Sequence, residues 1–517
     1  MTRLSTATAL AVILASSPAL AEITPSSVWE QLGEYYEAFG LTVQTEAVEE
    51  AGDTVTVRGL VLSQKTPADA PSDAHVEVQF GDVVLNATGD GGVSMDLPDQ
   101  SAMVITTEIP KPASALDTPA DAEKMVSVTV ELAMTNPGES ITVREDGTGN
   151  LYEYDFPTLE VAVNRIVAAD GKVIENPGKM SLTNFTGTEH IESGDSFKLS
   201  QTGAADQLTM NVDYADEQGA AVIVATMADL VYNADSIVPA GADLGANMAQ
   251  ALKAGLDVKG GFKGGATDIK IDVTNSGGPG GPEAVAIAST VESFALDFLI
   301  SEGRIGYSGT SGASSTDMTV PDLPFPISYG IDSAQFNLEM PVSPSEDPQP
   351  FAFAYGFAGL TLSEGIWGMF DPQSALPRDP ANLTVDLSGM ARLDVDIFDP
   401  EAMADPTVAP GEVSSVKINK IDLSALGATV SATGELNSPD GGDLTTPVGM
   451  ISGRLTGINA LFDKLSAAGL MPQDQAMGMR MMLAMFAKPD PDNADALTSE
   501  IEFKEGGSIF ANGQQVK

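Results

Sequence analysis

The sequence has 517 residues, a formal net charge of −48 at pH 7 and no cysteine. So acidic a chain repels nucleic acid and anionic lipid headgroups, which argues against the binding of either. Without cysteine it has no disulfide, no thiolate chemistry and no lipoprotein attachment site. The acidic residues are dispersed, which favours a solvated acidic surface over the alternative of a specific cation-binding surface.

Residues 1–21 have the pattern of a secretory signal peptide. Arg3 supplies a positive charge, a short apolar run follows from Ala7 to Ala15, and Ala19-Leu20-Ala21 fits the small-residue cleavage site. We therefore expect the mature chain to begin at Glu22 and, in a Gram-negative bacterium, to be periplasmic. No later stretch reaches the roughly 20 apolar residues of a membrane-spanning helix, so we expect no such segment after signal removal.

The first predicted element of the mature chain is a helix over residues 25–40. Ser26 or Ser27 is the expected N-cap, and Gly40 is the expected stop. One side of this helix is apolar, which predicts that it packs against the rest of the protein; its apolar residues are Val28, Leu32, Tyr35, Tyr36 and Phe39.

Most of the following chain alternates apolar and polar residues, which is typical of strands with one buried face. In "KMVSVTVELAM", Val126, Val128 and Val130 fall on one side, and Ser127 and Thr129 fall on the other. The pattern recurs over residues 53–62, 207–214, 267–274, 292–300 and 381–389. Short polar turns near Gly89, Glu145, Ala168 and Ser438 separate such runs. The predicted fold is therefore mainly β, an elongated, curved antiparallel sheet (a meander) with one apolar face.

A few helices are expected at the N-terminus, in the middle and at the C-terminus. The middle candidate covers residues 241–256, and a third runs from Gly457 through Pro472 into a methionine-rich segment. The stretch "NSGGPGGPE" at 275–283 is either a boundary between two halves or a long hairpin loop. We treat 22–517 as one elongated β-rich domain and leave a subdivision there open.

Residues with catalytic or metal-binding potential are sparse. His75 and His190 stand alone, and no nucleophile elbow, phosphate-binding loop or dinucleotide fingerprint occurs. "EDGTGNLYE" comes nearest to a calcium loop but lacks the third and last ligands, so a plain turn is favoured. Carboxylate pairs such as Asp394 and Asp396 are expected on a solvent face. We therefore expect no enzyme, no cofactor and no metal, with a carboxylate-based hydrolase as a minor alternative.

The segment from Leu360 to Gly389 is unlike a generic strand. It contains Trp367, Phe370 and an Arg378 flanked by two prolines, which stop a strand from continuing. We expect an aromatic anchor and a rigid corner, in which Arg378 pairs with Asp371 or Asp379. An Arg378 site for an anionic ligand is the alternative.

The segment "QAMGMRMMLAMFAKP" carries five methionines in nine residues. On a helix it is apolar nearly all round, which favours burial on several sides. Two alternatives stay open: the adaptable wall of a hydrophobic groove, and a thioether site for Cu(I). The positions concerned are Met477, Met479, Met481, Met482, Met485 and Phe486. A closing hairpin should then place Ile501 and Phe503 opposite the region of Ile509.

Four long motifs in the C-terminal part carry a family resemblance: "EGIWGMFDPQSALPRDPANLTVDLSG", "NKIDLSALGATVSATGEL", "PVGMISGRLTGINALFDKLSAAGLMPQDQAMGMRMMLAMFAKP" and "LTSEIEFKEGGSIFANGQQV". They resemble Domain of Unknown Function 2125, a family of exported alphaproteobacterial proteins. The resemblance is close from about Ser363 to the end and implies no catalytic residues. The closing "EGGSIFANGQ" also resembles the terminal hairpin of AsmA-like envelope proteins, whose long curved sheets have an apolar inner face suited to lipid chains.

An apolar face of this length must be covered by a second layer, by helices or by a ligand. The sequence favours a non-enzymatic periplasmic envelope protein whose C-terminal helices close part of an apolar groove, with lipid or another hydrophobic molecule in the remainder. The alternative is a structural or interaction protein with a fully packed core, which contacts an envelope protein partner and holds no ligand.

Overall fold

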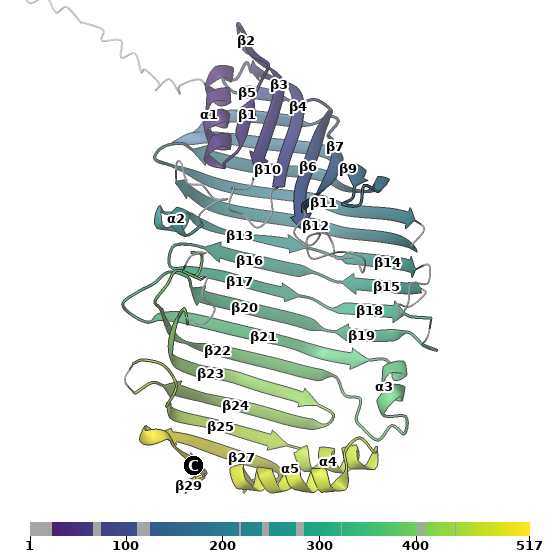
Figure 1. Ribbon diagram of the computed structural model, residues 1–517, viewed down its shortest axis with the longest axis vertical. Coiled ribbons are helices and arrows are strands. Elements are labelled where there is room, and N and C mark those ends of the chain that lie inside the picture. The colour runs from purple at the N-terminus through teal and green to yellow at the C-terminus, as the bar shows by residue number, and fades with distance from the viewer. Residues whose placement is uncertain are drawn as a thin grey trace, which may run out of the picture.

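The computed structural model describes residues 23–65, 74–110, 125–216, 219–239, 248–275, 284–321, 323–399, 402–403, 409–439 and 441–517. The signal peptide, residues 276–283 and the first part of the middle helix lie outside this range, so those predictions stay predictions. Figure 1 shows one tall antiparallel sheet whose strands lie across the long axis, with helices at its ends and sides. The predicted fold class is confirmed.

The upper end of the sheet is built from short strands and one helix. The helix is α1 (Pro25–Ala38). Its N-cap is Thr24 and not Ser26 or Ser27, because Thr24 Oγ1 accepts a hydrogen bond from the Ser27 backbone N–H at 3.2 Å. The strands are β1 (Thr42–Gln44), β2 (Ala47–Ala51), β3 (Thr54–Lys65), β4 (Ala74–Ala87), β5 (Val93–Asp96), β6 (Gln100–Pro110), β7 (Met125–Thr135) and β8 (Ser140–Asp146).

Four long strands and eight short ones form the middle of the sheet. The long strands are β9 (Gly149–Val167), β10 (Val173–Glu192), β11 (Ser196–Asp216) and β12 (Gly219–Pro239). The short strands are β13 (Asp257–Gly264), β14 (Thr267–Asn275), β15 (Ala284–Val291), β16 (Phe294–Ile300), β17 (Arg304–Ser311), β18 (Ser314–Thr319), β19 (Ile327–Ile331) and β20 (Ser333–Pro341). The strands that flank the glycine-rich segment 276–283, β14 and β15, pair directly with each other.

The lower end carries the remaining strands and three helices. The strands are β21 (Gln349–Leu362), β22 (Ala381–Leu393), β23 (Gly411–Ala425), β24 (Ala428–Asn437), β25 (Val448–Thr456), β26 (Lys488–Asp490), β27 (Asn493–Lys504), β28 (Ser508–Ala511) and β29 (Gln514–Gln515). The helices are α3 (Glu364–Phe370), α4 (Ile458–Ala467) and α5 (Gln473–Phe486). The predicted closing hairpin is confirmed, with Phe503 opposite Ile509. None of the helices that the structure describes is both long and apolar enough to cross a bilayer.

A line of distorted residues crosses the middle of the sheet, and we call it the crease. Beyond β12 the crease interrupts the strands, so that two shorter strands pair with different parts of one neighbour. β13 and β14 both pair with β12, and β20 and β19 both pair with β21. The crease consists of Asn184, Asp206, Asp229, Gly265, Ser293, Gly312, Asp332 and Gly359, which follow one another across the sheet. Asn184, Asp229 and Gly359 have φ of 50°, 52° and 72°, a region in which Gly, Asn and Asp are the least strained.

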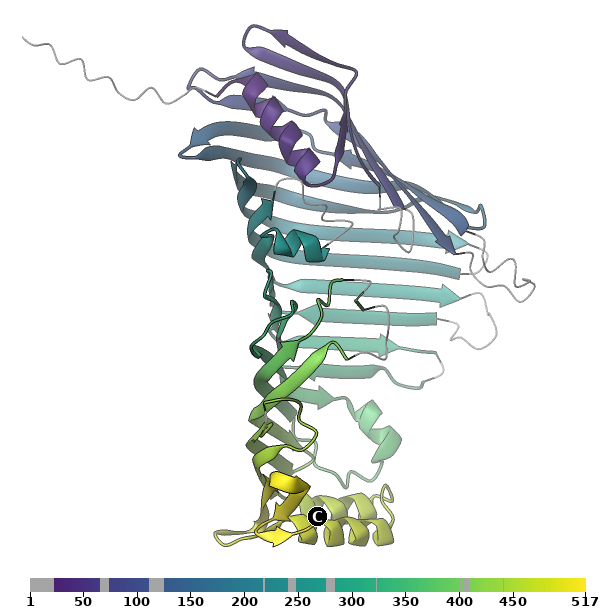
Figure 2. The same cartoon turned by 60° about the vertical axis from the view of Figure 1, so that its left-hand side comes forward.

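The crease keeps the apolar residues on one side of the bent sheet. In β12 the more shielded positions are odd before the crease, at Ala221 and Ile223, and even after it, at Leu230 and Tyr232. The residue at the crease therefore changes which positions of β12, odd or even, face the apolar side, at the place where the sheet bends. Figure 2 shows the sheet turning about its long axis. The predicted period of two is correct on each side of the crease but not across it.

The main core runs from the upper end into the middle of the sheet, where α1 and then α2 (Met248–Lys253) pack on its apolar side. Val28 and Leu32 of α1, and Leu252 of α2, belong to one buried cluster, and Ile300 and Ile305 pack against it. Burying a side chain such as Val28 contributes about 1.5–3 kcal/mol. The members of this cluster from the strands are Val55, Val57, Leu60, Leu62, Val83, Leu85, Val93, Val143, Tyr152, Ile191, Phe197, Leu199 and Val238.

Candidate functional site

The apolar face continues below α2 as rows of side chains on neighbouring strands. Val258, Ile300 and Ile305 are direct cross-strand partners beneath the core cluster, so they point to the same side of the sheet. Side chains alternate between the two faces of a strand, so residues two and four positions away from Val258, Ile300 and Ile305 lie on that same side. One row consists of Phe262, Leu296, Gly309, Phe336 and Tyr355, and the next consists of Gly260, Phe298, Tyr307, Leu338 and Phe353.

Six large apolar or aromatic side chains of these rows are open to solvent, and we call them the apolar patch. Their exposed fractions are 44% for Leu296, 42% for Tyr307, 40% for Phe336, 36% for Leu338, 42% for Phe353 and 46% for Tyr355. They come from the adjacent strands β16, β17, β20 and β21. A contiguous apolar surface of this kind marks an interaction site in soluble proteins.

Glycines let the aromatic rings of the apolar patch lie flat on the sheet. A Cβ atom added to Gly309 would come within 2.4 Å of a Phe336 ring carbon and 2.8 Å of Leu296. Likewise, a Cβ atom on Gly260 would approach the Phe298 ring to 2.8 Å. The rings therefore cover the bare backbone of the neighbouring strand, and the patch presents a smooth apolar surface.

The opposite side of the same strands is polar or has small side chains. Asp297 pairs with Ser308, which pairs with Asn337, and Asn337 pairs with Ala354. A shallow depression of about 250 Å³ there is lined by Thr310, Gln335 and Ala358 among others. The exposed large apolar side chains of these four strands therefore lie on the apolar face.

A cluster of hydrogen-bonded polar side chains around Glu189 lies on the apolar face, at the edge of the region that α1 covers. The carboxylate of Glu189 accepts hydrogen bonds from the Tyr35 hydroxyl at 3.0 Å, from Gln201 Nε2 at 2.7 Å and from the Tyr154 hydroxyl at 2.7 Å. Tyr35 comes from α1, whereas Tyr154, Glu189 and Gln201 come from β9, β10 and β11. Burial and the nearby charge of Glu189 raise the pKa of Tyr36 to about 12 and raise the pKa values of Tyr35 and Tyr154. These tyrosines are therefore neutral hydrogen-bond donors at ordinary pH.

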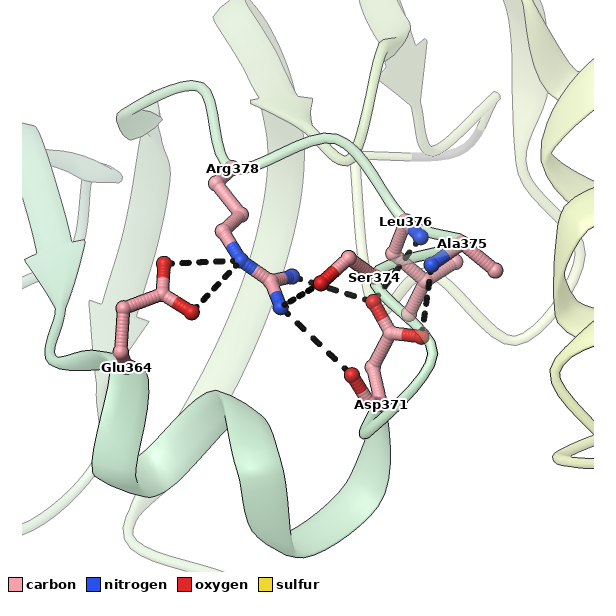
Figure 3. A network of polar contacts seen from close by, with 6 residues as sticks. All are labelled: Glu364, Asp371, Ser374, Ala375, Leu376 and Arg378. Atoms are coloured by element: carbon pink, nitrogen blue, oxygen red, sulfur yellow. Dashed lines mark hydrogen bonds and ion pairs between the residues drawn. The ribbon is translucent and has the colours of Figure 1, made fainter.

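The corner after β21 is held by Arg378, as Figure 3 shows. Arg378 Nη1 donates to Asp371 Oδ2 at 3.0 Å, Nε donates to Glu364 Oε1 at 2.9 Å, and Nη2 donates to Ser374 Oγ at 3.1 Å. The guanidinium also lies 4.8 Å from the centre of the Trp367 ring. Each guanidinium nitrogen has a partner in the protein, so the geometry favours a structural role for Arg378 over an anion site.

Trp367 and Phe370 differ in their surroundings. Both belong to α3, a short helix that the sequence analysis did not predict, and their rings lie 5.0 Å apart. Trp367 is buried, with 7% of its surface exposed, whereas Phe370 is 36% exposed. Trp367 is thus the expected aromatic anchor, and Phe370 lies at its solvent edge.

Asp371 is a buried carboxylate at the end of α3. Burial alone raises its pKa, but hydrogen bonds from the backbone N–H groups of Leu376 and Ala375, together with Arg378, outweigh it and lower the pKa below the ordinary 3.8. The carboxylate form therefore stabilises the fold above that pH, and this stabilisation is lost as the pH falls through the lowered pKa.

Asp371→Asn should lower the melting temperature at neutral pH, because the variant lacks the charge that Arg378 and the two N–H groups stabilise. The difference in melting temperature between wild type and variant should shrink once the pH falls below about 3.8, because the wild-type carboxylate then becomes protonated. Thermal melts monitored by circular dichroism across the acid range measure it. A difference that does not change with pH would contradict this role of Asp371.

The methionine-rich helix α5 is mostly exposed, and the prediction that it is buried on several sides is wrong. Met477, Met481 and Met485 form one ridge with exposed fractions of 63%, 65% and 59%, and Met482 and Phe486 beside them are 49% and 37% exposed. Ala476 is the buried residue of this helix, and Arg480 bonds to Asp463 of α4 at 2.7 Å. The helix packs on β27 and α4 at the lower end of the sheet, and most of its apolar surface stays uncovered (Figure 1). The distribution of apolar residues around a helix does not by itself show whether those residues are buried or exposed.

Replacing Met481 and Met485 together by glutamate should change the free energy of unfolding by less than about 1 kcal/mol, since exposed substitutions away from special features cost within roughly 0.5 kcal/mol each. Burial would instead make the change strongly destabilising. Urea denaturation of the wild type and the variant measures the difference. A loss of several kcal/mol would show that α5 is covered in solution.

The C-terminal part of the chain matches a known protein family. Residues 306–510 match DUF2125, an uncharacterized protein conserved in bacteria. This match confirms the resemblance to DUF2125 and extends it upstream of Ser363. Five of the six residues of the apolar patch lie inside the DUF2125 region, whereas Leu296, Glu189 and the two upper helices lie outside it. Comparison with curated proteins finds no match. Comparison with solved structures finds none either.

The sequence pattern predicted part of the apolar patch but not the rest. It placed Leu296 with Phe294, Phe298 and Ile300 on one side of a strand, as the cross-strand partners confirm. It did not single out Tyr307, Phe336, Leu338, Phe353, Tyr355 or Glu189. The alternation of aromatic residues with Ala and Gly in "FAFAYGF", within the DUF2125 region, is a signal that could have found two of them.

Proposed function

We propose that this protein is a non-enzymatic envelope protein of the periplasm and that the apolar patch binds the hydrocarbon chains of lipids. The observation that carries the proposal is the patch itself, six large side chains that are each more than a third exposed on one face of four adjacent strands. Covering them with a hydrocarbon chain is favourable by about 25 cal/mol for each Å² of apolar surface removed from water.

Two features of the sequence support the periplasmic address and the ligand class. Residues 1–21 have the pattern of a secretory signal peptide. The closing "EGGSIFANGQ" resembles the terminal hairpin of AsmA-like proteins, whose long sheets are suited to lipid chains. The helices α4 and α5 lie at the lower end of the sheet and leave the patch open, so they do not close it as the sequence analysis expected.

Native mass spectrometry of the protein purified from its own periplasm, without added detergent, tests this function. The expected result is a reproducible additional mass that organic extraction identifies as lipid. A clean mass of the protein alone, together with no binding of decyl-chain amphiphiles in titrations, would contradict the proposal.

The second candidate is a structural or interaction protein without a ligand. The observation that favours it is the exposed methionine ridge of α5, because flexible thioether side chains suit adaptable contact with a protein partner. A clean mass in the preceding experiment would favour this candidate, with α5 as the contact surface.

A further inference from the structure

Glu189 lies in the same row of side chains as part of the apolar patch. Proceeding strand by strand, its direct partners are Gln201, Ala234, Gly260 and Phe298, and the row continues through Tyr307. A carboxylate and an apolar surface are therefore joined along one line on one face of the sheet. Beyond Gln201, which donates to Glu189, the row continues through the small residues Ala234 and Gly260 before it reaches Phe298.

The spacing of this row suits a lipid. Four strand-to-strand steps separate Glu189 from Phe298, or about 19 Å at about 4.8 Å per step. A single hydrocarbon chain spans about 15 Å in one leaflet of a bilayer. A headgroup at Glu189 would therefore direct its chain along this row and place the chain end near Phe298, one strand before Tyr307 of the apolar patch.

Glu189 retains one unused hydrogen-bonding position. An ionised carboxylate accepts about four hydrogen bonds, and Tyr35, Gln201 and Tyr154 supply three. All three donors are neutral, and among the described residues no cation pairs with Glu189. The negative charge thus has three neutral donors and no positive partner among the described residues, an environment that attracts an ammonium group through a charge-assisted hydrogen bond.

We propose that Glu189, with Tyr35 and Tyr154, binds the ammonium headgroup of a lipid whose hydrocarbon chain lies along the row toward the apolar patch. This inference rests on the proposed lipid-binding function and names the headgroup class. An anionic headgroup is disfavoured by Glu189 and by the net charge of −48, whereas a headgroup with an ammonium group is attracted.

The test compares two ligands with the same chain, decylamine and decanol, by isothermal titration of the mature protein at neutral pH. The wild type should bind decylamine about tenfold more tightly, as expected for one charge-assisted hydrogen bond. Glu189→Gln keeps the size of the side chain and should reduce the preference to near parity without changing the affinity for decanol. Asp297→Asn removes the same charge from the opposite face and should retain the preference.

The outcomes separate the two proposals. Equal affinities of the wild type for both ligands, or a Glu189→Gln variant that keeps the wild-type preference and melts normally, would overturn the headgroup assignment and leave lipid binding in place. Binding of neither ligand to the wild type would overturn the proposed function together with this inference. Loss of the preference in both variants would assign it to the overall charge and not to Glu189.

Discussion

Replacing Phe336 and Tyr355 together by glutamate should weaken binding of decanol by about 100-fold. The two rings are direct cross-strand partners in the centre of the apolar patch. Each contributes roughly 1.4 kcal/mol, or about tenfold in affinity, when a hydrocarbon chain covers it. Both side chains are at least 40% exposed, so the fold itself should tolerate the change.

The same strands provide a matched control. Asn337 and Ala354 are also direct partners, one position along from Phe336 and Tyr355, and therefore on the opposite face. Asn337→Glu with Ala354→Glu adds the same two charges at the same level of the sheet and should leave the affinity within about twofold of wild type. Equal losses in the two double variants would show that added charge, and not the apolar patch, controls binding.

Trp367→Ala should lower the free energy of unfolding by about 3–5 kcal/mol, the usual cost of removing a buried tryptophan side chain. Trp367 fills the space under α3, packs on Phe370 and carries the Arg378 guanidinium on its ring. Its removal leaves a cavity and also loosens the ion pair between Arg378 and Asp371. Urea denaturation of the wild type and the variant measures the loss.

Met369→Ala is the control for this helix. Met369 lies in the same α3 but is 61% exposed, so its replacement should change the free energy of unfolding by no more than about 0.5 kcal/mol. Similar losses for both variants would mean that α3 itself, rather than the buried anchor, is the sensitive feature.

Local patterns were enough to predict the antiparallel strands and most of the helices. The alternation in "ESFALDFLI" reports which side chains share a face, because each strand buries one side. The closing hairpin was predictable for the same reason, since its residues lie near each other in the sequence. For Arg378 the sequence left two nearby partners open, Asp371 and Asp379, and the structure shows the pair with Asp371.

Long-range features were not predictable from local patterns. The crease depends on Asp229 of β12 lying beside Gly265, between β13 and β14, and on Gly265 lying beside Ser293, between β15 and β16, which no local pattern reveals. Whether a side chain is exposed also depends on which other elements cover it. The apolar residues all round α5 therefore suggested burial, although Met481 is 65% exposed. Glu189 gained its partners only when α1 placed Tyr35 against the sheet.

The most direct measurement uses the absence of cysteine from the chain. A single cysteine is introduced at Leu338 on the apolar patch or at Asn337 on the opposite face, and each is labelled with a polarity-sensitive fluorophore. If hydrocarbon chains bind the apolar patch, saturating decanol should shift the emission of the label at position 338 to shorter wavelength and leave the label at position 337 unchanged. No shift at 338, or an equal shift at both positions, would contradict lipid binding at this face.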